Sequence, residues 1–250
     1  SFTLASPLWY LVFDISRLDG PKPSPIRKHS YEERECRFLS KFIKPGMVCF
    51  DIGANQGFYT LLFSKCVGPQ GKVFAFEPAP SEFRKLKWNV LINRLSNVTI
   101  EPLALSYREG IAYMFVCLDG KGSYSSLRRP AESVRARKKL IQGPTSDLNS
   151  YVHHNNIKNI DFIKIDVEGG ELDVLKGGLG ILSRLHPVIM CELADIRTRQ
   201  WGYMASDIFS LLRRNGYTGF RITPNLTLKF ALQKEKYEPD WENLIMVPEH

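Results

Sequence analysis

The chain has 250 residues, of which 44% are hydrophobic, and a formal net charge of +8 at pH 7. This length suits one large domain or two small ones, and the apolar fraction is typical of a globular protein with a sizeable core. No apolar run reaches the length of a membrane span, which excludes a transmembrane helix in this chain. The positive charge is too dispersed to indicate a nucleic-acid partner.

The five cysteines are an odd number, and no two of them are spaced as C-x-x-C. Cys49, Cys117 and Cys191 lie in short apolar runs that are typical of strands, so we expect buried, reduced thiols. Reduced thiols are typical of a reducing compartment, and a cytoplasmic location is therefore expected.

Residues 1–45 are expected to form a helical extension and a linker in front of the domain. The segment 18–29 is rich in proline and charge and predicts a surface loop. Apolar and aromatic residues recur at helical spacing over residues 31–43, and the Lys-Pro-Gly sequence that follows is a stop signal for this helix.

From residue 46 onward, strand-like and helix-like segments alternate. The expected strands are residues 47–52, 72–78, 98–105, 161–169, 187–193, 217–223 and 243–248. The expected helices are residues 58–67, 80–93, 171–182 and 205–216, with Ser81 as the N-cap of the second of them. Residues 110–127 interrupt this alternation and predict an extra strand followed by a Gly/Ser loop. The basic stretch 128–139 predicts a solvated loop and helix face.

Strands that are separated by helices indicate parallel β-α-β units with helices on both faces of a sheet. The strand-like runs are almost continuously apolar, as burial on both faces requires. We therefore expect an α/β fold, a three-layer α/β/α sandwich on a mostly parallel sheet, formed by residues 46–250 as a single domain.

A glycine-containing turn, D-I-G-A-N-Q-G, joins the first expected strand to its helix. Such a turn lets the backbone approach a nucleotide-like ligand and exposes the free N–H groups of the helix N-terminus. A dinucleotide site would have G-x-G-x-x-G, but Asn55 stands where the second glycine belongs, and no P-loop sequence is present. The pattern therefore disfavours an NAD-dependent oxidoreductase.

S-adenosylmethionine has no phosphate, but its ammonium group and its ribose diol both need acceptors. Asp51 ends the first strand and suits the ammonium group, while Glu77 ends the second strand and suits the diol. An acid after the second strand would also serve NAD, so the glycine pattern is the feature that discriminates. The cofactor-binding residues predicted at these two strand ends are Asp51, Gly53, Asn55, Gly57, Glu77 and Pro78.

Four motifs occur in one order between about residues 47 and 192: D-I-G-A-N-x-G-x-Y-T, A-F-E-P-x-P, A-L-S and D-F-I-K-I-D-V-E-G-G-E. Together they resemble the FkbM family of S-adenosylmethionine-dependent methyltransferases. The resemblance implies the class I, Rossmann-like fold, with a seven-stranded sheet that contains one antiparallel strand. It also implies O-methylation of sugars or natural products, and an adenine site near Ala104, Leu105 and Ser106.

Asp166 and Glu168 are two residues apart at the end of the fourth strand, where both could project toward a ligand. We expect Asp166 to face the methionine part of the cofactor or the transferred methyl group, and Glu168 to act as a base or to position the acceptor. Lys164 would share this side of the strand and could pair with a carboxylate.

Other roles remain open for these acids. They could cap the next helix, or Asp166, Glu168 and Glu192 could together bind a divalent cation, although no metal is expected. His154 is a less favoured base, because the pair His153 and His154 is expected in a polar loop. Residues 120–130 could form a substrate lid.

The expected acceptor is therefore a hydroxyl group of a small molecule or glycan. The alternatives are an N-methyltransferase and a non-catalytic module that binds S-adenosylmethionine. An open cleft beside Asp166 would favour the enzyme, and a blocked one would favour the module.

Overall fold

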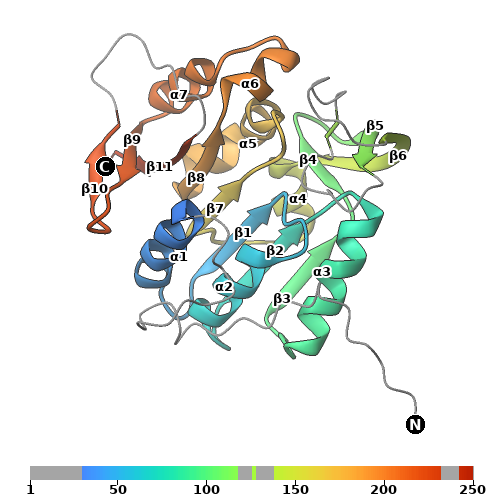
Figure 1. Ribbon diagram of the computed structural model, residues 1–250, viewed down its shortest axis with the longest axis horizontal. Coiled ribbons are helices and arrows are strands. Elements are labelled where there is room, and N and C mark those ends of the chain that lie inside the picture. Colours follow the sequence, from blue (N-terminus) through green and yellow to red (C-terminus); the bar gives the residue numbers. More distant parts are fainter. Residues whose placement is uncertain (1–29, 118–125, 128–137, 232–241, 250) are drawn as a thin grey trace.

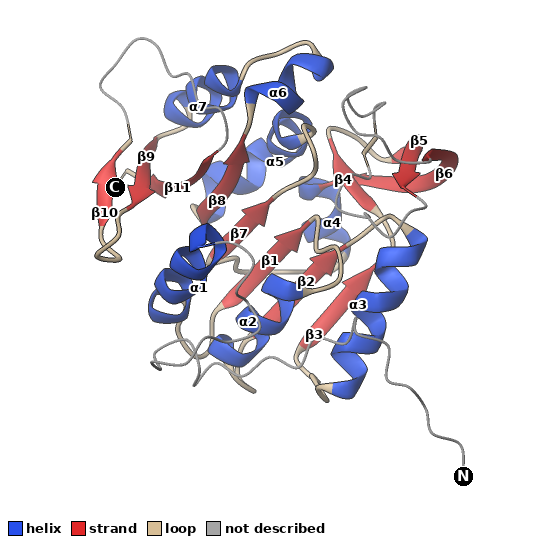
Figure 2. Cartoon of the chain, in the orientation of Figure 1, coloured by secondary structure: helices blue, strands red, loops and turns tan. Residues whose placement is uncertain are grey.

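The computed structural model describes residues 30–117, 126–127, 138–231 and 242–249, and these residues form three layers (Figure 1). An eight-stranded sheet with the order β10-β9-β11-β8-β7-β1-β2-β3 lies at the centre. Helices cover both of its faces (Figure 2). The predicted α/β/α sandwich is confirmed. The predicted linker at residues 18–29 and most of the basic stretch lie outside the described residues.

The strands of this sheet are β1 (Val48–Ile52), β2 (Lys72–Phe76), β3 (Val98–Glu101), β7 (Phe162–Ile165), β8 (Val188–Leu193), β9 (Tyr217–Ile222), β10 (Leu228–Phe230) and β11 (Glu242–Pro248). Neighbours from β3 to β8 are parallel. Strand β11 runs antiparallel between β8 and β9. All seven expected strands are thus present with one antiparallel member, and the short β10 adds an eighth at the edge by pairing with β9.

A second sheet has three strands, in the order β4-β6-β5. They are β4 (Ala104–Ser106), β5 (Gly110–Cys117) and β6 (Lys138–Asp147). The expected strand 98–105 is therefore split in two, because Pro102 has no N–H group to continue the ladder with β2. The sequence did not predict β6, and residues 138–139 begin this strand instead of a helix face.

Three helices pack on one face of the main sheet: α1 (Ser30–Phe42), α2 (Phe58–Val67) and α3 (Pro80–Ile92). The other face carries α4 (Leu148–His154), α5 (Glu171–Leu185) and α7 (Ala205–Arg214). Between β8 and α7 lie α6 (Asp195–Thr198) and the short 3-10 helix η3 (Arg199–Trp201). Within the described ranges, no helix combines the length and the apolar character that a membrane crossing requires.

The predicted N-cap of α3 is wrong. The helix begins at Pro80, its N-cap is Ala79, and no side chain caps it. Proline favours the first position of a helix, because its fixed φ suits the helix and it has no N–H group to leave unpaired. The Ala79 N–H donates to the Glu77 carboxylate instead, at 2.8 Å. Ser81 therefore lies inside the helix.

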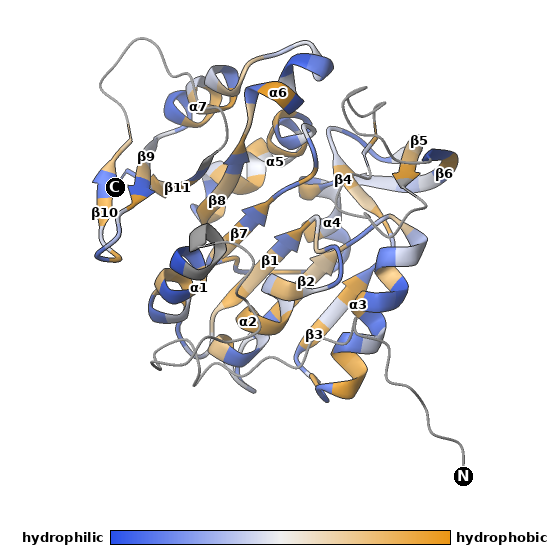
Figure 3. Ribbon diagram, viewed as in Figure 1, coloured by the Kyte–Doolittle hydropathy of each residue, from blue (hydrophilic) through white to orange (hydrophobic). Residues whose placement is uncertain are grey.

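Alternate residues of the central strands contribute to two different cores. Phe50 and Ile52 belong to the cluster beneath α4, α5 and α7, whereas Cys49 belongs to the cluster beneath α1 and α2. Figure 3 shows central strands that are largely hydrophobic and become hydrophilic near their carboxyl ends. The polar groups therefore gather at one edge of the sheet, while the strands themselves are held by apolar packing.

Helix α5 passes close behind β4. A Cβ atom at Gly177 would overlap with the backbone oxygen of Ser106, and one at Gly178 would lie 2.8 Å from Leu148 Cδ2. Glycine weakens a helix, but at these positions a larger residue would push α5 away from the second sheet. The glycines of this helix therefore have a packing role.

We predict that Gly177→Ala lowers the free energy of unfolding by about 1–3 kcal/mol because of this overlap, although alanine is intrinsically the better helix former by about 1 kcal/mol. Urea denaturation measures the change. The matched control is Gly180→Ala, whose Cβ would meet only the Asn149 side-chain oxygen, at 3.1 Å. The control should be nearly neutral, and equal stabilities of both variants and the wild type would contradict the close packing.

Candidate active site

The turn after β1 lies against the end of β7. Gly53 has a φ of 81°, and a Cβ atom there would overlap with the backbone oxygen of Asp166. The Gly53 N–H donates to the Phe76 carbonyl at 3.0 Å, which fixes the turn to the end of β2 as well. Only glycine fits a position that combines this conformation with this close approach.

Asn55 also adopts a left-handed conformation, with a φ of 51°. Asparagine tolerates this region better than most residues, so it can stand where a dinucleotide site has glycine. The Asn55 N–H donates to Glu77 Oε2 at 2.8 Å. The turn after β1 and the acid after β2 are thereby joined by a direct hydrogen bond.

Glu77 is 6% exposed and accepts N–H groups on both of its carboxylate oxygens, from Asn55 and from Ala79. Burial raises the pKa of Glu77 to about 7, although these two hydrogen bonds act in the opposite direction. The carboxylate is thus held rigidly at the end of β2, where it faces a pocket.

This pocket lies at the carboxyl ends of β1, β2 and β7, beside the second sheet (Figure 1). Predicted site residues in its lining are Gly53, Asn55, Glu77, Pro78, Ala104, Leu105, Asp166 and Glu168. Phe76, Leu103, Met114, Leu127 and Val167 supply apolar surface. The pocket is open, and acidic groups lie among its apolar walls.

Three of the predicted cofactor residues lie outside this lining. Asp51 is 1% exposed and lies below the pocket, where it accepts a hydrogen bond from Thr60 at 2.6 Å. Gly57 is the N-cap of α2. Ser106 is buried at the end of β4. The structure thus places these residues next to the pocket and not in contact with its interior.

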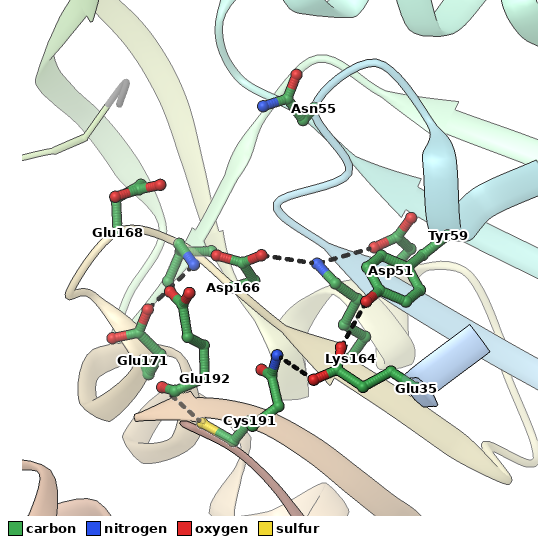
Figure 4. A network of polar contacts seen from close by, with 12 residues as sticks. Glu35, Asp51, Asn55, Tyr59, Lys164, Asp166, Glu168, Glu171, Cys191 and Glu192 are labelled. Carbon is green, nitrogen blue, oxygen red and sulfur yellow. Dashed lines mark hydrogen bonds and ion pairs between the residues drawn. The ribbon is translucent and has the colours of Figure 1, made fainter. Parts of the chain in front are cut away.

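Asp166 directly follows β7 and pairs with Lys164 at 3.3 Å. Burial acts to raise the pKa of Asp166, but the positive charges of Lys164 and Arg197 outweigh it and hold this pKa below its ordinary value. Asp166 therefore presents a negative charge to the pocket. Figure 4 shows Asp166 and Lys164 side by side, with Glu168 farther along the turn.

Glu168 has a φ of 57° and lies 3.0 Å from the Arg197 guanidinium. The same guanidinium nitrogen contacts Glu192 at 2.5 Å. Burial raises the pKa of Glu168 to about 8 and that of Glu192 well above its ordinary value, although Arg197 acts to lower both. Two carboxyl groups thus share one cation, and near neutral pH they share a proton as well.

The turn between β7 and α5 is fixed by other groups. Glu171 Oε1 accepts the N–H groups of Val167 and Gly169, both at 3.1 Å, and the Tyr203 hydroxyl donates to the Gly169 carbonyl. The N-cap of α5 is Gly170, which makes no side-chain capping bond. The capping role considered for Asp166 and Glu168 is therefore wrong, and both acids are available for chemistry.

The two remaining alternatives for these acids fit the geometry poorly. In the described part of the chain, no group of three His, Cys, Asp or Glu residues is arranged to hold a metal ion. Arg197 instead lies between Glu168 and Glu192. His153 and His154 end α4 instead of lying in a loop, and His154 pairs with Glu109 at 3.5 Å, away from the pocket lining.

Sequence reasoning missed Trp201 and Arg197. The indole of Trp201 lines the pocket and packs against the turn after β7, where a Cβ atom at Gly169 would lie 2.7 Å from it. The Gly-Gly pair leaves room for this ring, but nothing in the spacing of the sequence indicates which aromatic residue fills that room. Arg197 gave no signal either, because it is one arginine among many.

Part of the expected lid is described. Ser126 pairs with Phe115 of β5, its hydroxyl donates to the Glu168 carbonyl at 3.2 Å, and both Ser126 and Leu127 line the pocket. The other residues of the expected lid, 120–125 and 128–130, lie outside the described residues. The second sheet thus extends the pocket beyond the three strand ends.

The strand order and the pocket define a class of protein, the Rossmann-like methyltransferases that use S-adenosylmethionine. Among solved structures, the chain is similar to methyltransferase FkbM from Methylobacillus flagellatus KT, with a TM-score of 0.50 and 14% identity. The match covers 81% of this chain and 43% of that one. At this identity the likeness shows the fold alone.

The family model "Methyltransferase FkbM domain" matches residues 51–218, more than half of the chain. The chain therefore belongs to the FkbM methyltransferase family, and the family predicted from the four motifs is confirmed. With the family, S-adenosylmethionine is confirmed as the cofactor, and the NAD-dependent alternative is excluded.

Curated relatives agree with this assignment. The chain is 28% identical over 204 residues to the 31-O-demethyl-FK506 methyltransferase FkbM of Streptomyces tacrolimicus, which covers 70% of this chain and 74% of that protein. It is 28% identical over 142 residues to Methyltransferase 1 of Beauveria bassiana (strain ARSEF 2860), which covers 51% of this chain. The chain spans 56% of the Beauveria protein.

We predict that Glu168→Gln raises the melting temperature relative to the wild type more at about pH 9 than at about pH 6. Because folding raises the pKa of Glu168 to about 8, the stability associated with its protonated form is lost as the pH rises through that value. The neutral glutamine does not titrate. Thermal unfolding followed by circular dichroism measures the difference, and a difference that does not change with pH would contradict the assigned pKa.

Proposed function

We propose that this chain transfers a methyl group from S-adenosylmethionine to a hydroxyl group of a sugar or a natural-product-like small molecule. The observation that carries the proposal is the position of the Glu168 carboxyl in the same pocket as the Gly53 turn, Glu77 and Asp166. A group with the character of a base thus lies beside residues suited to the methyl donor. The name of the Streptomyces relative, an O-demethyl-FK506 methyltransferase, supports a hydroxyl acceptor.

The residues of the pocket fit S-adenosylmethionine. Glu77 offers a fixed carboxylate to a ribose diol, and the turn at Gly53 leaves space for a ligand to approach the backbone. Ala104, Leu105 and Phe76 form an apolar wall suited to adenine, and Asp166 offers negative charge to the amino-acid end. When bound, S-adenosylmethionine supplies an electrophilic methyl group on its sulfonium.

The chain's own contribution begins with orientation. Rigid placement of two reactants can supply about 7–11 kcal/mol of barrier lowering. The hydrogen bonds from Asn55 and Ala79 fix Glu77, and Glu171 fixes the turn that carries Glu168. Trp201 and Met114 add apolar surface to the same pocket and would limit the access of water.

Glu168 is suited to the proton transfer that a hydroxyl acceptor requires. A general base acts best when its pKa lies near the working pH, and burial raises the pKa of Glu168 to about 8. The Arg197 guanidinium at 3.0 Å keeps the ionised form accessible. We therefore assign Glu168 as the base that takes the hydroxyl proton, and Asp166 as the acid that faces the cofactor.

A non-catalytic module is the second candidate. A protein of that kind needs no base and no space for an acceptor next to the cofactor. The pocket instead continues past Asp166 to Glu168, Ser126 and Trp201. This continuation favours transfer over binding alone. An amine acceptor would depend less on Glu168, so the dependence of turnover on this residue separates O-methylation from N-methylation.

We predict that Glu77→Ala weakens the binding of S-adenosylmethionine at least about tenfold, because loss of charge-assisted hydrogen bonds typically costs about 1.5–3 kcal/mol. Isothermal titration calorimetry measures the affinity. The exposed Glu109 provides a control, since Glu109→Ala should bind like the wild type. Unchanged affinity in a folded Glu77→Ala variant would remove Glu77 from the site.

We predict that Glu168→Gln lowers methyl transfer by about 100-fold or more, the usual contribution of a general base, while it leaves affinity for S-adenosylmethionine within a few-fold of the wild type. The assay uses S-adenosylmethionine with a radiolabelled methyl group and a panel of glycosides and macrolides that carry free hydroxyl groups. Full turnover by the variant on an acceptor that the wild type methylates would refute the assignment of the base.

A further inference from the structure

A buried ammonium group lies directly beneath the pocket. The Lys164 side chain is 4% exposed, and its Nζ lies 3.3 Å from Asp166 Oδ2 and 3.6 Å from Asp51 Oδ1 (Figure 4). It also lies 4.9 Å from the centre of the Tyr59 ring. Lys164 is thus in contact with an acid on the pocket wall, an acid below the pocket and an aromatic face.

The two acids differ in what they can reach. The Asp166 side chain is 34% exposed and lines the pocket. The Asp51 side chain is 1% exposed, lies outside the lining, and has Thr60 and Lys164 as its neighbours. A ligand in the pocket can therefore meet Asp166 directly, whereas any influence of Asp51 has to pass through Lys164.

The ring beside Lys164 is held from two distant parts of the chain. The Tyr59 hydroxyl donates to Glu35 Oε2 of α1 at 2.7 Å, and Asn243 of β11 donates to Glu35 Oε1 at 2.9 Å. A buried cation is stable only when charged or polar groups surround it closely. The N-terminal helix thereby takes part in fixing the surroundings of Lys164.

We propose that Lys164 is a positioning residue of the cofactor pocket, which holds the Asp166 carboxylate toward the amino-acid end of the ligand and has Asp51 as its buried counter-ion. This inference rests on the proposed function, because the ligand in question is S-adenosylmethionine. It assigns Asp51 an indirect role, in place of the direct contact with the ammonium group that its position in the sequence suggests.

Two ligands separate this role from a general loss of structure. S-adenosylhomocysteine carries an amino-acid end, whereas 5′-methylthioadenosine has the same nucleoside and no amino-acid end. If Lys164 acts through Asp166, its loss weakens only the first ligand. If Lys164 merely supports the fold, its loss weakens both ligands together.

Isothermal titration calorimetry with both ligands tests the proposal on Lys164→Met, Asp51→Asn and the double variant. We expect Lys164→Met to weaken S-adenosylhomocysteine at least about tenfold and 5′-methylthioadenosine less than about twofold. Because Asp51 acts through Lys164, the double variant should be no weaker than Lys164→Met alone. Lys176→Met replaces an exposed lysine of α5 and should bind both ligands like the wild type.

Each other outcome is informative. An equal loss for both ligands, or unchanged S-adenosylhomocysteine binding in Lys164→Met, would overturn the positioning role. Additive losses in the double variant would show that Asp51 reaches the ligand independently and would overturn its role as counter-ion. Binding of 5′-methylthioadenosine also reports that each variant is folded. A wild-type chain that binds neither ligand would instead refute the proposed function.

Discussion

The parallel, in-register pairing of β1, β2 and β7 is the constraint on which the site depends. Ile52 pairs with Phe76 on one side and with Ile165 on the other, so the three strands end in one row. The next residue of each strand is Gly53, Glu77 or Asp166. The sheet thus brings together a turn with room for a ligand and two acids from positions more than a hundred residues apart in the sequence.

This arrangement concentrates negative charge, and the structure balances it with two buried cations. Lys164 lies between Asp51 and Asp166, and Arg197 lies between Glu168 and Glu192. The balance is incomplete, because burial leaves the pKa values of Glu77 and Glu168 above their ordinary values. Raised pKa values reduce the stability of the ionised site, but they also place a proton acceptor near neutral pH, where proton transfer to a carboxylate is useful.

Much of the site could be predicted because it follows from where strands end. Apolar runs locate the strands, parallel topology places their carboxyl ends at one edge, and the residues that follow them, such as Gly53 and Glu77, are then neighbours. Asn55 fits the same logic, since its left-handed conformation and its hydrogen bond to Glu77 belong to the turn itself.

The elements that could not be predicted depend on contacts distant in sequence. Strand β6 forms because it pairs along its length with β5, and its own sequence, with Gly143 and Pro144, gives little signal for a strand. Trp201 enters the site from η3, beyond β8, to fill the space that Gly169 leaves. The indirect position of Asp51 was also invisible, because a strand-end carboxylate has the same sequence signature whether it faces a ligand or a buried lysine.

A crystal structure of the chain with S-adenosylhomocysteine would test the central claim most directly, that the edge formed by β1, β2 and β7 is the cofactor site. The account predicts the ribose hydroxyls on Glu77, the adenine beside Leu105, and the amino-acid end near Asp166. Ligand density elsewhere on the molecule, or a ribose away from Glu77, would contradict it.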